Sequence, residues 1–263
     1  MRKEETVMVK VGILKLLLPC GYSILLPNLF FLKTISSSGR LLFPSRSNNH
    51  FRMKKIIPSL ILALFFFATV LSAADNALSK SEKADGWKLL FNGKNLNNWK
   101  IDKWNPESIS VKDGAIKCHG KPSMVYYTGK GKEMTDFHFK ADVMTKPGSN
   151  GGIFFHTQYQ DKGWPVGHEA QINQTQKAPV KTGSVYIVKK NLEAPAKDNE
   201  WFHYEIIVKG KRVETKVDGK TVVVYNESKD VKGTRQLSKG TIGLQAHDPG
   251  STVLVKNIKV KSF

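Results

Sequence analysis

The chain has 263 residues, 41 of them basic and 22 acidic, which gives a formal net charge of +19. This length allows one or two domains. Residues 1–74 hold 10 of the basic and 2 of the acidic residues, so the rest of the chain holds 31 and 20. Nucleic acid is one partner that such a charge suggests. However, only Arg212 and Arg235 follow residue 74, and base and phosphate recognition relies on arginine, so the composition argues against nucleic-acid binding.

Residues 53–74 have the layout of a secretory signal peptide. Two lysines follow Met53, an apolar run extends over 60–71, and small residues then lead to Ala74. The apolar run is too short to cross a bilayer comfortably as a permanent helix. We therefore predict cleavage after Ala74 and export to the periplasm or the extracellular space.

Residues 1–52 contain apolar clusters broken by Pro19 and Pro27, followed by a basic, serine-rich stretch. We interpret this segment as an extension upstream of a true start at Met53, or as a disordered tail. A membrane-anchored tail is the alternative, and membrane contact is predicted only through an uncleaved leader. Removal of the leader would leave Cys118 as a lone cysteine, so no internal disulfide is expected.

From residue 86 onward, apolar residues recur at every second position, which is typical of β-strands. The stretch 135–143 alternates cleanly and places Ala141 and Val143 on one face together with two phenylalanines. Asp113-Gly114 and Asp218-Gly219 each separate two apolar runs. Asp-Gly in this position predicts a type I′ hairpin turn, because both central residues of that turn need positive φ.

About eleven to thirteen short strands can be counted over 86–263, with no convincing amphipathic helix. Short strands separated by Gly and Asp turns predict an all-β domain, a two-sheet antiparallel sandwich or jelly roll. Residues 75–85 are polar and are predicted to form a linker ahead of this domain.

The segment 167–173 places its three polar side chains, Glu169, Gln171 and Asn173, on one strand face and its apolar residues on the other. Trp164 lies just before it and could form an aromatic rim for a sugar ring. An exposed edge strand is the alternative interpretation. We expect this segment to carry the site, with Glu169 as its acid or base.

Other strands offer further polar candidates. Asp142 lies on the polar side of its strand, where a solvated face is the alternative. His156 follows the glycine pair 151–152, which indicates close backbone approach or a bulge, and a structural histidine fits equally well. Gln245 and His247 share a face, and His247 is a candidate acid or base because the pKa of histidine lies near neutrality. A loop histidine is the alternative there.

Several known chemistries have no motif in this sequence. There is no P-loop, no Gly-x-Gly-x-x-Gly after a strand, no Gly-x-Ser-x-Gly and no Cys-x-x-Cys pair. No histidine spacing indicates zinc, and His168-Glu169 alone is weak evidence for a metal. No cofactor is therefore expected, although a divalent cation is left open.

Several segments, in chain order, resemble the 3-keto-disaccharide hydrolase domain family: 86–99, 111–116, 149–155, 167–172, 182–186 and 240–247. The family resembles concanavalin-A-like lectins and glucanases, so the resemblance implies two antiparallel sheets with a concave sugar-binding face. Its members are commonly exported. The chain departs from the family pattern at 150–152, where Asn-Ser-Gly is usual, and at His156, where arginine is common.

The resemblance implies a carbohydrate substrate, cleaved by an enzyme that acts on glycosides already oxidised at C3. A ketone at C3 acidifies the C2 proton, so a base can remove it and expel the C1 leaving group; water can then add. In this interpretation Glu169 is the base or acid and His247 is its partner. The sugar-binding residues are Gln171, Gln245, His156, Trp164 and Tyr186. Lys181 or a bound cation would stabilise the enolate.

Ordinary glycoside hydrolysis with retention needs two carboxyl groups about 5 Å apart. The residue two positions after Glu169 is Gln171, which is neutral, so a second carboxylate would come from another strand, with Asp142 as the candidate. A non-catalytic carbohydrate-binding module is the alternative function, because the same polar face and Trp164 would serve it. A basic surface-adhesion protein is a third.

Overall fold

The computed structural model of the protein describes residues 6–10, 14–17, 23–26, 30–34 and 74–263. The chain divides into two compact units, 1–69 and 70–263. In the first, β1 (Thr6–Lys10) pairs with β4 (Phe30–Thr34), and β2 (Leu14–Leu17) pairs with β3 (Ser23–Leu26). Except for Ala74, the predicted signal peptide lies outside the described residues. No described helix is long and apolar enough to cross a membrane.

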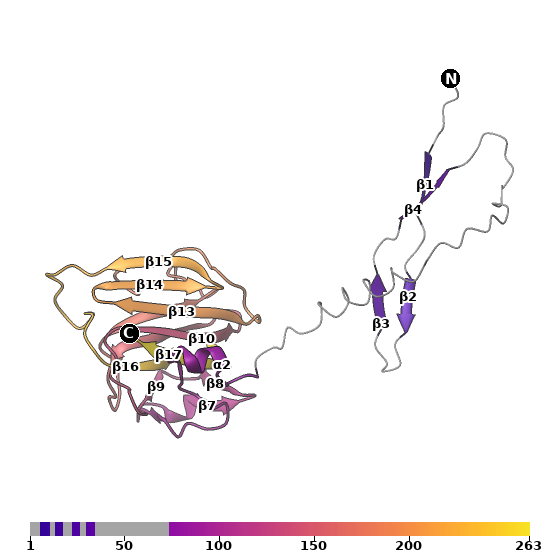
Figure 1. The fold of residues 1–263 in the computed structure, drawn as a ribbon. Coiled ribbons are helices and arrows are strands. Elements are labelled where there is room, and N and C mark those ends of the chain that lie inside the picture. The colour runs from indigo at the N-terminus through magenta and orange to yellow at the C-terminus, as the bar shows by residue number, and fades with distance from the viewer. Residues whose placement is uncertain (1–5, 11–13, 18–22, 27–29, 35–73) are drawn as a thin grey trace. The chain divides into compact units, whose positions relative to one another are not determined.

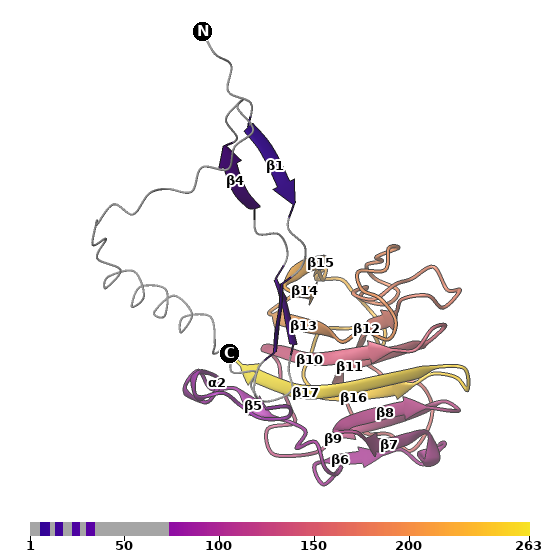
Figure 2. The same ribbon diagram turned by 90° about the vertical axis from the view of Figure 1, so that its right-hand side faces the viewer.

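The second unit contains two antiparallel sheets, as predicted. The larger has the order β15-β14-β13-β10-β17-β8-β7, with β5 also paired to β17 (Figures 1 and 2). Its strands are β5 (Lys88–Leu89), β7 (Ile109–Lys112), β8 (Ala115–His119), β10 (Phe137–Thr145), β13 (Phe202–Lys209), β14 (Arg212–Val217), β15 (Lys220–Asn226) and β17 (Thr252–Ser262).

The smaller sheet has five strands in the order β12-β11-β16-β9-β6. They are β6 (Trp99–Ile101), β9 (Ser123–Tyr127), β11 (Asn150–Thr157), β12 (His168–Asn173) and β16 (Thr241–Ala246), and a 3-10 turn, η2 (Pro106–Ser108), precedes β7. The all-β sandwich predicted from the sequence is therefore confirmed.

The core lies between the two sheets because each strand turns its apolar residues inward. In β10, buried and half-buried residues alternate from end to end, and Phe137 and Phe139 are fully buried. Ile153 and Phe155 of β11 belong to the same apolar cluster, although they come from the other sheet. Each large side chain buried in this way contributes about 1.5–3 kcal/mol to folding.

The Asp-Gly turns have the predicted geometry. Asp113 and Gly114, between β7 and β8, have φ angles of 50° and 75°, and Asp218 and Gly219, between β14 and β15, have φ angles of 48° and 76°. Positive φ at both central residues is what a two-residue type I′ hairpin requires. These turns fix the register of their strands, and thereby which residues face the core.

The predicted linker, 75–85, contains a short helix, α2 (Lys80–Ala84), that contacts the larger sheet. Ser79 and Glu82 form a capping box at the N-terminus of the helix. Burial would raise the pKa of Glu82, but hydrogen bonds from Lys140 and Lys259 outweigh it and lower the pKa to about 2. These contacts join separate parts of the sequence, so local pattern did not reveal them.

Candidate functional site

A cavity of about 440 Å³ opens on the outer face of the five-stranded sheet. We call it the Glu169 cavity. Its floor comes from β11, β12 and β16, and its walls come from the loops that follow or precede these strands. The lining residues are Asn150, Phe154, Trp164, Glu169, Gln171, Ala178, Pro179, Val180, Tyr186, Arg235, Gln245 and His247.

Strand register brings the floor residues together. Glu169 of β12 pairs with Phe154 of β11, which in turn pairs with Gly243 of β16. Gln171, two residues after Glu169, pairs with Gly152. Because side chains alternate along a strand, Glu169 and Gln171 point to the same side, as the sequence predicted.

Glu169 is a buried carboxyl group beside one cation. It is only 5% exposed, and its Oε2 lies 3.9 Å from Nη2 of Arg235. Burial raises the pKa of Glu169 to about 7, and the positive charge of Arg235 opposes part of that rise. A carboxyl group with a pKa near neutrality is suited to general acid and base catalysis at physiological pH.

Arg235 closes over the floor from the segment between β15 and β16. Its Nη1 donates a hydrogen bond of 3.0 Å to the carbonyl of Gly167, which places the guanidinium at the start of β12. The guanidinium carbon also lies 5.3 Å from the ring centre of Phe154 and 5.9 Å from that of Tyr186, within cation–π range. Two aromatic rings and a backbone carbonyl therefore hold the guanidinium of Arg235 beside Glu169.

Glu227 anchors the segment that carries Arg235. Its carboxylate accepts hydrogen bonds from the backbone N–H of Leu237 at 2.7 Å, from Nζ of Lys211 at 2.7 Å and from His168 at 3.2 Å. Burial would raise the pKa of Glu227, but these hydrogen bonds outweigh it and hold the pKa below its usual range. His168, on the core face of β12, thus serves this anchor rather than the cavity.

A chain of hydrogen bonds crosses the opposite end of the floor. Nε2 of Gln171 donates to Oδ1 of Asn150 at 2.6 Å, and Nδ2 of Asn150 lies 3.5 Å from Nε2 of His247. Nδ1 of His247 is 2.8 Å from a carboxylate oxygen of Asp248, which Ser251 also contacts. Asp248 therefore orients the imidazole, and Gln171 orients the amide of Asn150 with its N–H groups toward His247.

Trp164, for which the sequence suggested an aromatic rim, lies at the edge of the Glu169 cavity. Its ring stacks on His247 with centroids 5.7 Å apart and an interplanar angle of 24°, and Trp104 packs edge-on against it. Trp164 remains 46% exposed, and Tyr186 on another wall is 37% exposed. Exposed aromatic faces beside a polar floor are suited to contact with sugar rings.

Gln245 supplies an unused acceptor to the floor. It is 4% exposed, and its Oε1 is buried without a hydrogen-bond partner among the described residues. A buried polar atom left unpaired costs about 1–3 kcal/mol, so a ligand hydroxyl that donates to it would recover that energy.

Three predicted site residues, Asp142, His156 and Lys181, lie outside the Glu169 cavity. Asp142, on β10 of the other sheet, contacts His203 at 2.8 Å and Asn257 at 2.6 Å. His156 is 4% exposed and lies in a bulge with φ of 52°, where its ring contacts the carbonyl of Thr135 and accepts from the N–H of Ser238.

Nζ of Lys181 donates to the carbonyl of Gln176 rather than reaching the cavity. The alternation of polar and apolar residues predicted a polar strand face for Asp142, but it does not predict the sheet to which that strand belongs. The other six predicted site residues line the Glu169 cavity: Trp164, Glu169, Gln171, Tyr186, Gln245 and His247.

Sequence reasoning missed Arg235, Asn150 and Phe154, together with the wall 178–180. One signal for Arg235 was available, because it is one of two arginines after residue 74. Asn150 lies in a segment that resembles the family and could have been selected there. Within the described ranges, no group of three or more His, Cys, Asp or Glu side chains is arranged to hold a metal ion.

The comparisons with known proteins agree with the fold. A crystal structure of a candidate glycosyl hydrolase from Parabacteroides distasonis ATCC 8503 is 25% identical, with a TM-score of 0.62, and covers 72% of this chain and 99% of that chain. A second candidate glycosyl hydrolase from that organism is also 25% identical, with a TM-score of 0.53, and covers 67% of this chain and 99% of that chain. No curated protein matches the chain.

The carbohydrate-binding module CBM66 of Bacillus subtilis is more distant, at 15% identity and a TM-score of 0.46, with 64% of this chain and 98% of that chain covered. The model of the 3-keto-alpha-glucoside-1,2-lyase-like domain matches residues 86–261, which include both sheets and every residue that lines the Glu169 cavity. The chain therefore belongs to the 3-keto-alpha-glucoside-1,2-lyase-like domain family.

Proposed function

We propose that the protein cleaves glycosides whose sugar carries a ketone at C3, by elimination across C1 and C2, with Glu169 as the base. One observation carries the proposal beyond the family relationship. Among the described residues that line the cavity, Glu169 is the only carboxylic acid, and its pKa is raised to about 7. Retaining and inverting glycosidases commonly use two carboxyl groups, whereas elimination beside a ketone needs one base.

The steps balance with a single carboxyl group. The carboxylate of Glu169 takes the C2 proton, and the electrons of the C2–H bond form an enolate with the C3 carbonyl. When the carbonyl re-forms, a C1–C2 double bond forms and the C1–O bond breaks. The leaving oxygen takes the proton from Glu169, which restores the carboxylate. The products are a 1,2-unsaturated 3-ketosugar and a free alcohol or sugar, and water can add to the former.

The developing enolate needs donors that are already in place. Nδ2 of Asn150 is oriented by the 2.6 Å hydrogen bond between Gln171 and Asn150 Oδ1, and His247 lies beside it. We assign the N–H groups of Asn150 to the C3 oxygen, and His247, whose Nδ1 donates to Asp248, to the positioning of that amide. Donors fixed before the reaction stabilise developing charge without reorganisation, and loss of one such donor typically costs about 10²–10³-fold in rate.

The remaining groups would bind the sugar. Trp164 and Tyr186 offer aromatic faces at the rim, and Oε1 of Gln245 offers an acceptor to a hydroxyl group. The guanidinium of Arg235 lies 3.9 Å from the carboxyl group of Glu169 and would keep the carboxylate in place during proton transfer. Lys181, expected as an enolate partner, has no part in this arrangement.

Turnover of a 3-keto-glucoside by the purified full-length protein tests the proposal. Glu169→Gln should abolish turnover, and Asp142→Asn, on the other sheet, should leave it unchanged. Binding of plain glycans with no product from any 3-keto-glycoside would favour a non-catalytic carbohydrate-binding module. Equal turnover by Glu169→Gln and the native protein would reject the catalytic assignment.

We also propose that the protein is exported. The proposal is supported by the charge and apolar pattern of residues 53–74. N-terminal sequencing of protein recovered from outside the cytoplasm should begin at Asp75. A first residue before Met53 would contradict both the proposed cleavage and the proposed start.

A further inference from the structure

Arg235 lies in residues 227–240, which join β15 to β16 and which we call the Arg235 segment. Three residues after Arg235, the backbone N–H of Ser238 donates a hydrogen bond of 3.0 Å to Nδ1 of His156. His156 belongs to β11 but does not line the Glu169 cavity. The part of the segment next to Arg235 is therefore held by a histidine outside the cavity.

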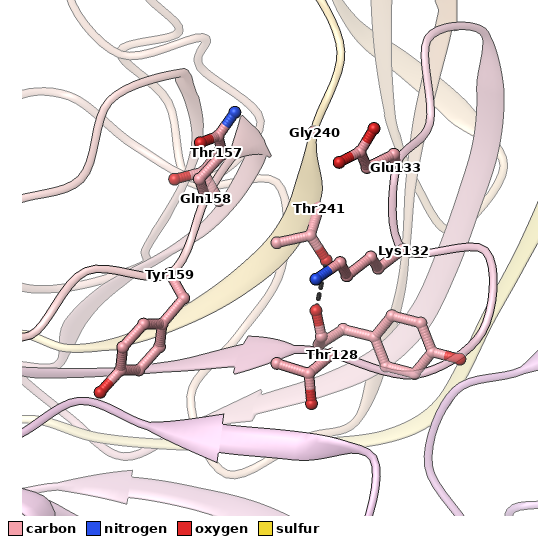
Figure 3. Close-up of a pocket in the computed structure, with 9 residues that line it drawn as sticks. Thr128, Lys132, Glu133, Thr157, Gln158, Tyr159, Gly240 and Thr241 are labelled. Atoms are coloured by element: carbon pink, nitrogen blue, oxygen red, sulfur yellow. Dashed lines mark hydrogen bonds between the residues drawn. The ribbon is translucent and has the colours of Figure 1, made fainter.

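The end of the Arg235 segment is fixed by backbone contacts. Gly240 exchanges two hydrogen bonds with Met134, at 2.9 and 3.1 Å, and a Cβ atom on Gly240 would lie 2.6 Å from the carbonyl carbon of His156. In Figure 3, Gly240 lies between Thr157, the last residue of β11, and Glu133, and all three line a cavity of about 220 Å³. Backbone groups do not titrate, so this end stays in place at any pH, whereas the contact of Ser238 need not.

The two partners of the His156 ring fix its protonation. Its Nε2 lies 2.8 Å from the carbonyl of Thr135, which can only accept, so Nε2 carries the proton. The N–H of Ser238 can only donate, so Nδ1 is bare and the ring is neutral. A second proton on Nδ1 would point at the N–H of Ser238 and abolish the hydrogen bond. Arginine, common at this position in the family, has no acceptor, so the contact is a property of this chain.

The surroundings of His156 favour the neutral ring. The residue is only 4% exposed, and this burial lowers the pKa of His156, although the hydrogen bond to Thr135 opposes part of the effect. Titratable groups from three other parts of the chain also act on the ring: His168, Asp136 and Glu227. The histidine lowers the pKa of His156 and the two carboxylates raise it.

We propose that His156 is a positioning residue for Arg235, and that protonation of its ring releases the Arg235 segment from the Glu169 cavity as the pH falls. Released, the ring regains its ordinary pKa of 6.5, whereas in the closed state its pKa is lower. The closed state therefore binds fewer protons than the released one. Its advantage is complete above about pH 6.5 and falls by up to about tenfold per pH unit below that value.

Amide hydrogen exchange of the full-length protein, followed by NMR from about pH 5 to pH 8, tests the inference without any substrate. After correction for the intrinsic exchange rate, the protection of the Ser238 amide should be constant at the upper end and fall by up to about tenfold per pH unit below about pH 6.5. Amides of β10 should keep their protection, which shows that the fold is intact. The ring nitrogen shifts of His156 should report a proton on Nε2 alone at about pH 8.

Three variants separate the groups that titrate. His156→Asn keeps an acceptor near the place of Nδ1 and tolerates the φ angle of 52°, so its Ser238 amide should have protection that does not depend on pH. His156→Arg has no acceptor and should leave this amide weakly protected at every pH. His168→Gln can still donate to Glu227 and should keep the pH dependence of the native protein.

Equal Ser238 protection at both ends of the pH range in the native protein would overturn the inference while leaving the proposed function intact. An unchanged pH dependence in His156→Asn, its loss in His168→Gln, or a proton on Nδ1 of His156 at high pH would overturn it as well.

Reaction rates extend the test and rest on the proposed function. Below about pH 6.5, kcat/KM for a 3-keto-glucoside should fall more steeply in the native protein than in His156→Asn, because only the native protein also loses Arg235 from the site. Equally steep profiles would contradict a role of His156 in positioning Arg235. Absence of turnover in both proteins would reject the proposed function, and the exchange of the Ser238 amide would still decide the inference.

Discussion

Gly152 lies directly against the carboxyl group of Glu169. A Cβ atom at position 152 would lie 2.5 Å from Oε1 of Glu169, 2.7 Å from its Cγ and 2.9 Å from its Cδ. All three distances are shorter than a Cβ atom tolerates to a non-bonded atom, so any side chain at this position would displace the carboxyl group. The glycine is therefore needed for the position of the proposed base, rather than for a positive φ angle.

Gly152→Ala should lower kcat for a 3-keto-glycoside by about 10²-fold, which is the usual effect of a reacting group misplaced by about 1 Å. Steady-state kinetics gives the rate, and circular dichroism checks that the sheets are intact. A correctly folded Gly152→Ala protein with native kcat would show that the carboxyl position does not matter.

Glu169→Gln should stabilise the fold at alkaline pH while it abolishes activity. The pKa of Glu169 is raised by burial to about 7, above the ordinary 4.5, so the native state binds more protons than the unfolded state between these values. Native stability therefore falls as pH rises through this window, and glutamine avoids that loss. The advantage of the variant should grow from pH 5 to pH 8 by up to about 3 kcal/mol.

Urea unfolding of both proteins at several pH values measures this difference. Asp142→Asn serves as the control for loss of a carboxylate. If the stability advantage of Glu169→Gln over the native protein shrinks as pH rises, the pKa of Glu169 is not raised in the folded protein.

Arg235→Gln should shift the pH–rate profile to higher pH. Its cation opposes the effect of burial on the pKa of Glu169, so its removal raises that pKa further. The carboxylate is the active form of the base. The pH at which kcat/KM rises should therefore be higher in the variant than in the native protein. Arg235→Lys retains a positive charge and should move the profile less. An unchanged or downward shift in Arg235→Gln would contradict this electrostatic role.

Asn150→Ala should lower kcat by about 10²–10³-fold with a smaller effect on KM, because it removes a donor assigned to the enolate oxygen. Gln171→Glu offers a related test, since it replaces the amide that orients Asn150 at 2.6 Å with an acceptor. A rise in KM alone for Asn150→Ala would assign that side chain to ground-state binding instead.

The strand pattern could be predicted from the sequence because alternation of apolar residues and Asp-Gly turns are local signals. The facing of Glu169 and Gln171 followed from the same alternation, and β12 bears it out. Strand order is not local. Asp142 also lies on a polar strand face, but β10 pairs with β13 and β17 in the larger sheet, which puts it outside the Glu169 cavity.

The remaining differences have the same origin. Arg235 reaches the site only because Glu227, in another part of the chain, anchors its loop through the N–H of Leu237. His156 leaves the strand alternation at a bulge, so its ring contacts Thr135 and Ser238 instead of a ligand. Long-range packing and a single irregular residue decided these positions, and neither has a signature within a short stretch of sequence.

The fate of the hydrogen at C2 tests the central claim most directly. A 3-keto-glucoside carrying deuterium at C2 would be incubated with the native protein in ordinary water, and its products analysed by mass spectrometry. Proton abstraction by Glu169 predicts that deuterium is lost from C2 as the glycosidic bond breaks, faster than the exchange seen with Glu169→Gln. A free 3-ketosugar that keeps its C2 deuterium would show direct hydrolysis at C1 and contradict the account.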